Sequence, residues 1–380
     1  MKRDFEFSRP LLTGLELDYV REAYATGRFS GDGKFTQLCH TWLEQRLKCS
    51  KAFLTPSCTA ALEMAALLAD IEPGDEIIMP SFTFTSTANA FVLRGGVPVF
   101  VDIRPDTLNL NEHLIAAAIS PRTKAICVMH YGGIACEMDA IMALAEREGL
   151  LVIEDAAHAI AASYKGRPLG SIGHLAALSF HQTKNVIAGE GGAILINAAH
   201  FADRAEIIRD KGTNRHMLLT GEVERYTWVD IGSSFLPSEL TAAFLWAQLS
   251  QAETIMQRRR DAWQTYHEGL ARLEAQGHVK RPTVPAGCEH NAHLYYLLLT
   301  KPAARANFIA SMREKGIATP FHYVPLHSSP AGKRFGRTAG PLATTDAVAA
   351  SLVRLPLSPE TGEYSQEIID AVASFFGSPE

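Results

Sequence analysis

The sequence has little cysteine, and none of it is arranged as a set of metal ligands. Six cysteines are spread over 380 residues, and no two of them form a Cys-x-x-Cys pair. This spacing argues against the usual zinc sites and against the disulfide framework of a small secreted domain. We therefore expect reduced thiols, no bound metal and a cytoplasmic location.

Charge of one sign and long apolar runs are also missing. The formal net charge is −5, so no overall basic field points to nucleic acid. Residues 1–7 carry positive charges with no apolar stretch behind them, so we expect no signal peptide. The apolar stretch 60–69 contains Glu63 and is too short to span a bilayer. We expect neither nucleic-acid nor membrane partners.

Several common catalytic motifs are absent. No Gly-x-Ser-x-Gly elbow is present, which argues against a hydrolase of that type. The segment Gly189-Glu190-Gly191-Gly192 lacks the Lys and Ser/Thr of a nucleotide P-loop, so it is interpreted as a tight turn. No Gly-x-Gly-x-x-Gly follows the first predicted strand, which disfavours an NAD-dependent dehydrogenase.

The chain does contain a regular alternation of β-rich runs and helical patterns from about residue 50 to 200. Helical crossovers join the first five strands, which predicts an α/β fold with a mostly parallel sheet covered on both faces. The seven predicted strands are 52–55, 76–80, 97–102, 125–129, 150–155, 176–180 and 193–196. The crossover helices are predicted at 58–70, 86–94, 111–119 and 138–148.

The pattern changes near residue 250. A long helix is predicted over 238–271, followed by a strand at 293–300 and helices at 303–315 and 346–352. We expect a large domain of residues 1–250 and a smaller C-terminal α/β domain of residues 251–380, hinged by the long helix.

Lys184 and Asp155 each lie at or just past the end of a predicted strand. The carboxyl ends of parallel strands meet at the edge of the sheet where such folds bind ligands. A desolvated lysine has a lowered pKa, and its neutral amine can form a Schiff base with an aldehyde cofactor. The usual aldehyde is pyridoxal phosphate, whose pyridinium nitrogen pairs with an aspartate. The two residues therefore predict a pyridoxal phosphate site.

Other residues at this edge have two interpretations each. Residues 57–59 follow a strand and open a helix, which suits either a phosphate site or a plain N-cap by Ser57. Phe84 either stacks on the cofactor ring or belongs to the core. His158, three residues past Asp155, either contacts the ring or packs as a structural histidine.

Together these segments resemble the DegT/DnrJ/StrS sugar-nucleotide aminotransferases. The resemblance implies pyridoxal phosphate-dependent fold type I, the aspartate aminotransferase fold. The matching segments run in the family's order over nearly the whole chain, at residues 56–62, 80–84, 154–158, 179–185, 189–192 and 323–327.

The resemblance implies a role for individual positions. Lys184 would bind the cofactor covalently, Asp155 would pair with the pyridinium nitrogen, and Phe84 would stack on the ring. The implied cofactor-binding residues are Ser57, Cys58, Thr59, Phe84, Asp155, His158, Ser179 and Ser234. The implied substrate-binding residues are Lys211, Arg215, Tyr323 and His327. Ser234 stands where much of the family has an asparagine that reaches the phosphate of the partner subunit, so its contact across the implied homodimer stays open.

Within this family, residues 30–36, 211–215, 226–228 and 230–234 resemble the branch that forms dTDP-4-amino-4,6-dideoxygalactose for enterobacterial surface glycans. That resemblance implies transfer of the amino group of L-glutamate to C4 of a dTDP-4-keto-6-deoxyhexose. The glucose epimer, amination at C3, a UDP nucleotide and a noncatalytic sensor on the same fold stay open. Family members that dehydrate sugars carry histidine at the position of Lys184, so lysine favours amino transfer.

Overall fold

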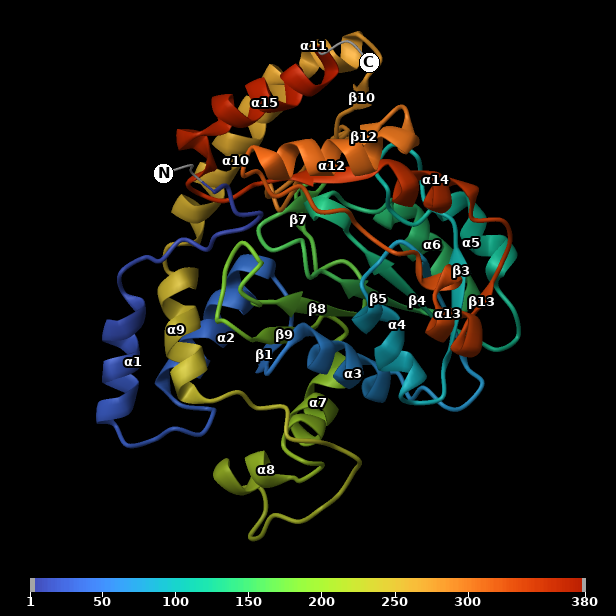
Figure 1. Cartoon of the computed structure of the whole chain (residues 1–380). Coiled ribbons are helices and arrows are strands. Elements are labelled where there is room, and N and C mark those ends of the chain that lie inside the picture. Colours follow the sequence, from blue (N-terminus) through green and yellow to red (C-terminus); the bar gives the residue numbers. More distant parts are fainter. Residues whose placement is uncertain (1–3, 378–380) are drawn as a thin grey trace.

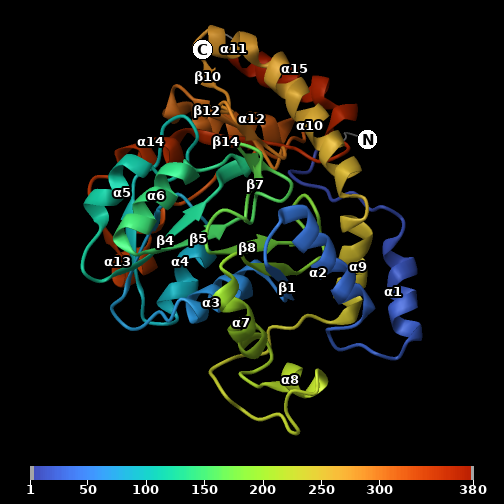
Figure 2. The same ribbon diagram turned by 180° about the vertical axis from the view of Figure 1, so that it is seen from behind.

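The computed structural model describes residues 4–377, and one large sheet runs through its centre (Figures 1 and 2). Its strand order is β1-β9-β8-β5-β4-β2-β3-β13. The strands are β1 Lys51–Thr55, β2 Glu76–Pro80, β3 Val97–Val101, β4 Thr123–Met129, β5 Leu151–Asp155, β8 Leu175–Ser179, β9 Gly192–Ile196 and β13 Arg337–Thr338. Strand β9 runs antiparallel to both neighbours and the other pairs are parallel. The predicted α/β fold is confirmed, and β13 adds a short eighth strand.

Helices cover both faces of this sheet, and β2 shows why its sequence is continuously apolar. Ile77 and Met79 pack into the core on one face, whereas Ile78 packs into the core on the other. A strand buried on both faces needs apolar residues at every position. The first face is covered by α3 Cys58–Leu68, α4 Thr85–Val92 and α7 Ala202–Arg209. The second is covered by α2 Lys34–Leu47, α5 Glu112–Ala118, α6 Met138–Glu148 and α9 Glu239–Leu249.

The glycine at position 192, where the glycine-rich turn leads into β9, is required for steric reasons. A Cβ atom on Gly192 would lie 2.4 Å from the carbonyl carbon of Ser57 and from the backbone nitrogen of Cys58. Only glycine lets the first residue of β9 approach the start of α3 this closely. The turn therefore brings the start of α3 against the strand end that carries Ser179, which pairs with Gly192 across the sheet.

The C-terminal part forms a second layer around a three-stranded sheet of order β10-β12-β14. Its elements are α10 Ala252–Gly269, α11 Ala271–Ala275, β10 Val279–Lys280, β12 Tyr295–Leu299, α12 Arg305–Glu314, α14 Ala343–Ser351, β14 Leu352–Leu355 and α15 Ser365–Gly377. Phe5 from the start of the chain also packs into the core of this layer. The division at residues 250 and 251 stays a prediction.

The prediction of one helix over 238–271 is wrong, because the helix is interrupted between α9 and α10. The backbone of Gln251 is non-helical, with φ −115° and ψ 12°. The apolar residues of α9, and Ala252 and Met256 at the start of α10, pack on the large sheet. Further along α10, residues 262, 263 and 266 pack in the C-terminal core, so this helix connects the two cores.

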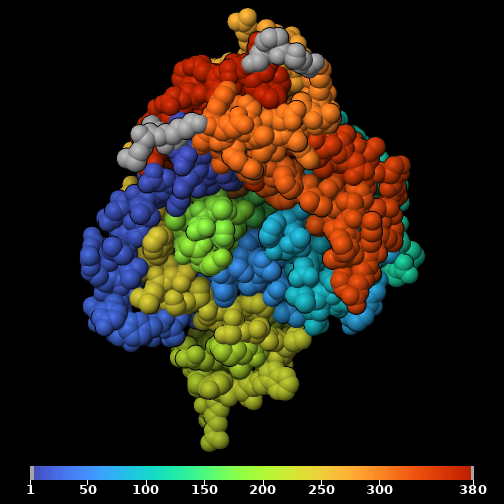
Figure 3. All heavy atoms as spheres, in the orientation of Figure 1, coloured from blue at the N-terminus to red at the C-terminus, as the bar shows by residue number. Residues whose placement is uncertain are grey.

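Residues around α8 (Arg215–Leu219) form a lobe that projects from the rest of the molecule (Figure 3). The remaining elements are α1 Glu16–Ala25, α13 Pro330–Phe335 and a small sheet of β6 Ser163–Tyr164, β7 Arg167–Pro168 and β11 Cys288–Glu289. Among residues 4–377, every helix is too short or too polar to cross a membrane.

Candidate active site

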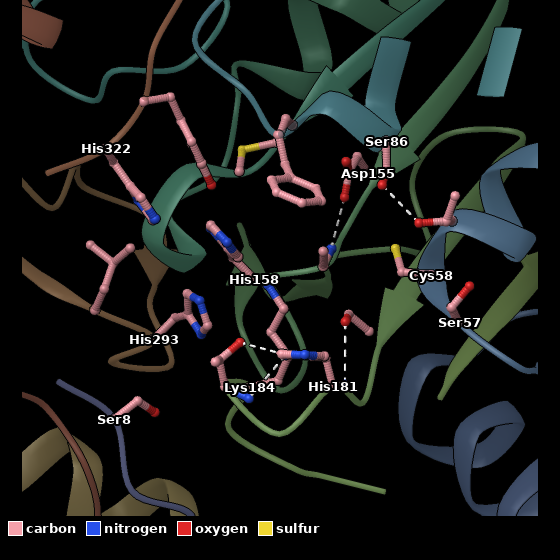
Figure 4. Close-up of a pocket in the computed structure, with 18 of the residues that line it drawn as sticks. Ser8, Ser57, Cys58, Ser86, Asp155, His158, His181, Lys184, His293 and His322 are labelled. Atoms are coloured by element: carbon pink, nitrogen blue, oxygen red, sulfur yellow. Dashed lines mark hydrogen bonds between the residues drawn. The ribbon is translucent and has the colours of Figure 1, made fainter. Parts of the chain in front are cut away.

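A cavity of about 550 Å³ lies at the carboxyl ends of β5 and β8. Both Lys184 and Asp155 line it, as the strand pattern predicts. Figure 4 shows Ser57, Cys58 and Ser86 on one side of these two residues and His158, His293 and His322 on the other. We call these two sides the hydroxyl wall and the histidine wall.

Asp155 ends β5 as a buried carboxylate, 4% exposed. Its Oδ2 accepts a hydrogen bond of 2.6 Å from the Thr87 hydroxyl, and its Oδ1 accepts one of 3.1 Å from the Ala157 backbone N–H. Burial raises the pKa of Asp155, while the hydrogen bond from Thr87 acts in the opposite direction. A cation placed against this carboxylate would favour its ionised form, so the position suits a pyridinium.

Lys184 lies in the loop after β8, and its backbone N–H donates to the carbonyl of His181 over 2.9 Å. Burial lowers the pKa of Lys184, and the Arg354 guanidinium acts in the same direction. Cys58 and Asp155 oppose this shift. The side chain therefore favours a neutral amine more than an exposed lysine does, which is the state that a nucleophile or base requires.

The hydroxyl wall is built from the start of α3, the start of α4 and the end of β8. The Ser57 hydroxyl accepts from the Ala60 backbone N–H over 3.1 Å, so it is the N-cap of α3. The Thr59 and Ser86 hydroxyls lie 2.7 Å apart, and the Ser179 hydroxyl accepts a 3.4 Å bond from the His181 backbone N–H. All four residues line the cavity. A helix start surrounded by hydroxyls is suited to an anion such as phosphate, so the N-cap and phosphate interpretations of Ser57 are compatible.

The histidine wall brings together three segments that lie far apart in the sequence. The rings of His158 and His293 stack with centroids 4.0 Å apart, and His322 lies parallel to His158 at 6.4 Å. Burial, together with nearby cations, lowers the pKa of all three histidines well below the ordinary value. This wall therefore presents neutral imidazoles to the cavity.

Asn185, the neighbour of Lys184, ties the lysine loop to the histidine wall. Its Oδ1 lies 2.8 Å from His293 Nδ1, and its Nδ2 donates to the Asn291 carbonyl over 2.8 Å. Asn291 in turn donates to the carbonyls of His158 and Ile160, both at 2.8 Å. The position of Lys184 therefore depends on a loop more than 100 residues later in the chain.

Phe84 and Tyr323 also line the cavity, as predicted from the sequence. Phe84 is 58% exposed, and this exposure leaves its ring available at the cavity. Tyr323 packs against Phe82 in an edge-on arrangement at 5.3 Å and stacks on His322 at 4.0 Å. Its pKa is raised by burial, so the phenol stays protonated.

Four other predicted residues lie outside the cavity of the single chain. The Lys211 ammonium and the Arg215 guanidinium both face Asp210, at 2.7 Å and 3.8 Å. Exposed Ser234 forms a β-bridge with the same Asp210. His327 is held by the Ser81 hydroxyl, 2.8 Å from its Nδ1, and by Asp346 at 3.3 Å. The roles that the sequence predicted for these four residues stay predictions.

Thr87, Ser86, His293, His322 and Arg354 are site residues that sequence reasoning missed. Thr87 and Ser86 fall inside a predicted helix, where hydroxyls carry no special signal. Arg354 has a visible signal in the sequence, because it is the one charged residue in the apolar run Leu352-Val353-Arg354-Leu355. Among residues 4–377, no group of three or more His, Cys, Asp or Glu is arranged to hold a metal ion.

Comparison with known proteins places this geometry among aminotransferases. The sequence model of the DegT/DnrJ/EryC1/StrS aminotransferase family matches residues 11–373. The spore coat polysaccharide biosynthesis protein SpsC of Bacillus subtilis is 32% identical over 375 residues, which cover 96% of this chain and 95% of SpsC.

Solved structures agree with this match. A DegT DnrJ EryC1 StrS aminotransferase from Brucella abortus has a TM-score of 0.87 and 30% identity, with 96% of each chain covered. The putative sugar aminotransferase Spr1654 of Streptococcus pneumoniae, in its PMP-form, has a TM-score of 0.90 and 26% identity, covering 97% of this chain and 98% of Spr1654. Spr1654 also has a solved PLP-form.

Proposed function

We propose a donor, an acceptor and a product for this chain, which belongs to the DegT/DnrJ/EryC1/StrS aminotransferase family. It is a pyridoxal phosphate-dependent sugar aminotransferase of fold type I. The proposed reaction transfers the amino group of L-glutamate to C4 of dTDP-4-keto-6-deoxy-D-glucose. The products are 2-oxoglutarate and dTDP-4-amino-4,6-dideoxy-D-galactose. The observation that carries this proposal is the pair of Lys184 and Asp155 in one buried cavity.

The cavity offers a partner for each part of the cofactor. Asp155 suits the pyridinium nitrogen, because it is a buried carboxylate with no cation bonded to it among the described residues. The start of α3, with Ser57, Cys58, Thr59 and Ser179, suits the phosphate. Phe84 suits one face of the ring and His158 the other. When bound, pyridoxal phosphate supplies the electron sink that makes removal of the α-proton from the donor feasible.

Lys184 is the proposed base. In the first half of the reaction, its neutral Nζ would take the proton from Cα of L-glutamate. In the second half, the protonated Nζ would donate a proton to C4 of the sugar. Burial lowers the pKa of this amine, which favours its neutral form. Asp155 would stabilise positive charge on the cofactor ring throughout.

We also propose a homodimer in which each active site takes residues from both subunits. The lobe that carries Lys211, Arg215 and Ser234 exposes large apolar side chains, with Trp228 78% exposed and Tyr226 55% exposed. Apolar surface of this kind is typical of an interface. The two cations would then reach the sugar nucleotide, and Ser234 the cofactor phosphate, in the site of the partner subunit. The proposed location is the cytoplasm.

The choice of C4 and of a dTDP nucleotide rests on the resemblance of residues 211–215 and 230–234 to the aminogalactose-forming branch. The glucose epimer, amination at C3 and a UDP nucleotide are the alternatives. A noncatalytic sensor is disfavoured, because binding alone would require neither Lys184 nor the buried Asp155.

The test combines the purified protein with pyridoxal phosphate, L-glutamate and dTDP-4-keto-6-deoxy-D-glucose. We expect a visible absorption band on addition of the cofactor, and NMR spectra of a product with an axial amine at C4. An equatorial amine or an amine at C3 would overturn the assigned product. Absence of both the band and any amino transfer would overturn the proposed activity.

A further inference from the structure

Arg259 is a buried arginine of α10, 2% exposed, and it does not line the cavity. Its Nε donates to the Ala292 carbonyl over 3.0 Å, and its Nη2 donates to the His293 carbonyl over 2.7 Å. Burial lowers the pKa of Arg259 to about 10, and no carboxylate among residues 4–377 opposes this shift. A buried cation is costly unless its donors are satisfied, and here two backbone carbonyls take the place of an acidic partner.

The segment that Arg259 contacts has a strained backbone. Ala292 is left-handed, with φ +50°, a conformation that costs free energy for a residue with a Cβ atom. The carbonyls of residues 291–293 all accept from side chains, the first from Asn185 and the other two from Arg259. One side chain can satisfy two consecutive carbonyls because the guanidinium holds its Nε and Nη2 donors in a rigid planar fork. Arg259 therefore stabilises the turn at residues 291–293 in this shape.

The turn at residues 291–293 is also where the loop of Lys184 is attached. Asn185 donates its Nδ2 to the first carbonyl of this turn over 2.8 Å, so its Oδ1 is the atom that faces His293 Nδ1 at 2.8 Å. One helical turn earlier in α10, the Met256 sulfur lies 3.4 Å from the same Nδ2. Helix α10 therefore contacts the neighbour of Lys184 both directly and through the turn.

We propose that Arg259 is a positioning residue for Lys184, which it reaches through the turn at residues 291–293 and Asn185. This inference rests on the proposed reaction of Lys184 with pyridoxal phosphate. The alternative is a purely structural role, because Arg259 lies between the residues of α10 that pack on the large sheet and those that pack in the C-terminal core. In that case its loss would lower stability and leave the reactivity of Lys184 unchanged.

The test measures how fast Lys184 reacts with the cofactor, as the rate constant for appearance of the visible band after apoprotein is mixed with pyridoxal phosphate. We expect Arg259→Met to lower this rate constant about tenfold, because a loosened loop holds the amine in the reactive geometry for less of the time. Arg259→Lys should fall between this variant and the wild type, since an ammonium lacks the fork. Arg258→Met, the same change at the exposed neighbour in α10, should leave the rate constant unchanged. A wild-type rate constant in Arg259→Met would overturn the proposal.

Pyridoxine phosphate separates the placement of the lysine from damage to the cavity, because it has the phosphate and the ring but no aldehyde. Its affinity, measured by calorimetry, should be equal in the wild type and in Arg259→Met. Weaker binding by the variant would mean that Arg259 supports the cavity as a whole, and would overturn the proposal. If Arg259→Met does not fold, Arg259→Lys decides by the same two measurements. Slower reaction with unchanged affinity would support the proposal, and a wild-type rate constant would contradict it.

A double variant tests the connection through Asn185. Asn185→Ala, alone or combined with Arg259→Met, should slow the reaction about tenfold, because the second change removes a link that the first has already broken. A loss of about 100-fold in the double variant would mean that the two residues act independently, and would overturn the proposal. Absence of the band in the wild type would contradict the proposed function itself, whereas an error in the proposed sugar would leave all these measurements unchanged.

Discussion

The hydroxyl wall and the histidine wall of the cavity are built by different means. The hydroxyl wall consists of the end of β8 and the starts of α3 and α4, all attached to the same sheet. The histidine wall consists of side chains from a turn after β5, a loop before β12 and a loop near residue 322. The first offers hydroxyls and backbone N–H groups, and the second offers neutral imidazoles.

This difference suggests a division of roles. The hydroxyl wall is attached directly to the large sheet, which suits the constant partner, the cofactor. The histidine wall is held by a few long-range hydrogen bonds, of which those of Asn185 are the most direct. Changes beside the cofactor should therefore affect the chemical step most, and changes on the histidine wall should affect the placement of Lys184.

Lys184→Ala should give the largest effect, since Lys184 lies between both walls and is the proposed base. We expect turnover to fall by at least about 10³-fold, which is the scale of general base catalysis. The fold should persist, because a single cavity-lining side chain is removed. Amino transfer and thermal unfolding are the two measurements. Lys184→Arg should be as inactive, because guanidinium stays charged, and wild-type-like transfer by either variant would contradict the assigned role.

Asp155→Asn should give the next largest effect. It keeps the shape of the side chain but removes the charge proposed to face the pyridinium, so we expect turnover about 100-fold lower. The phosphate contacts should still retain the cofactor, as measured from its absorbance after gel filtration.

Thr87→Val refines this test, because it keeps the Asp155 carboxylate but removes the 2.6 Å hydrogen bond to it, together with the 2.8 Å bond between the Thr87 and Thr83 hydroxyls. We expect turnover about tenfold lower, which is the scale of one hydrogen bond to a charged group. An effect as large as that of Asp155→Asn would mean that Thr87 does more than orient the carboxylate.

The contrast between the walls also decides what could be predicted from the sequence. Lys184 and Asp155 are predicted from their places at strand ends, and the seven predicted strands of the large sheet lie within two residues of those in the structure. Ser179 follows only from the family resemblance. His293 and His322 could not be predicted, because their positions depend on contacts between segments more than 100 residues apart. The predictions for Lys211, Arg215, Ser234 and His327 rest on the resemblance alone; these residues lie outside the cavity of the single chain, and their roles stay predictions.

Asn185→Ala tests whether the histidine wall positions Lys184. It removes two buried hydrogen bonds to residues 291 and 293, so we expect a loss of about 2 kcal/mol in unfolding free energy. Turnover should fall about tenfold, with a smaller change in cofactor affinity. Gln182→Ala, an exposed position in the same loop, is the matched control and should change neither quantity. Lost stability with full turnover would show that the two walls act independently.

Glu76→Gln should change stability but not activity, because Glu76 begins β2 at the edge of the sheet opposite the cavity. Its carboxylate is 1% exposed and pairs with Arg122 and Arg337, the latter in β13. The hydrogen bond from Arg337, followed by those from Ser120 and Arg122, lowers the pKa of Glu76 from 4.5 to about 2.

A lowered pKa in the folded protein gives stability that is present above the unfolded pKa and is lost as the pH falls toward the folded pKa. The difference corresponds to about 3 kcal/mol, lost between about pH 5 and pH 2. Urea unfolding across this range should show a steeper loss for the wild type than for Glu76→Gln, while amino transfer at neutral pH is equal in both. A Glu76→Gln variant with the same acid sensitivity as the wild type would show that the contact between β2 and β13 does not depend on this charge. Lowered amino transfer in this variant would show that a change at the far end of the strands affects the active site.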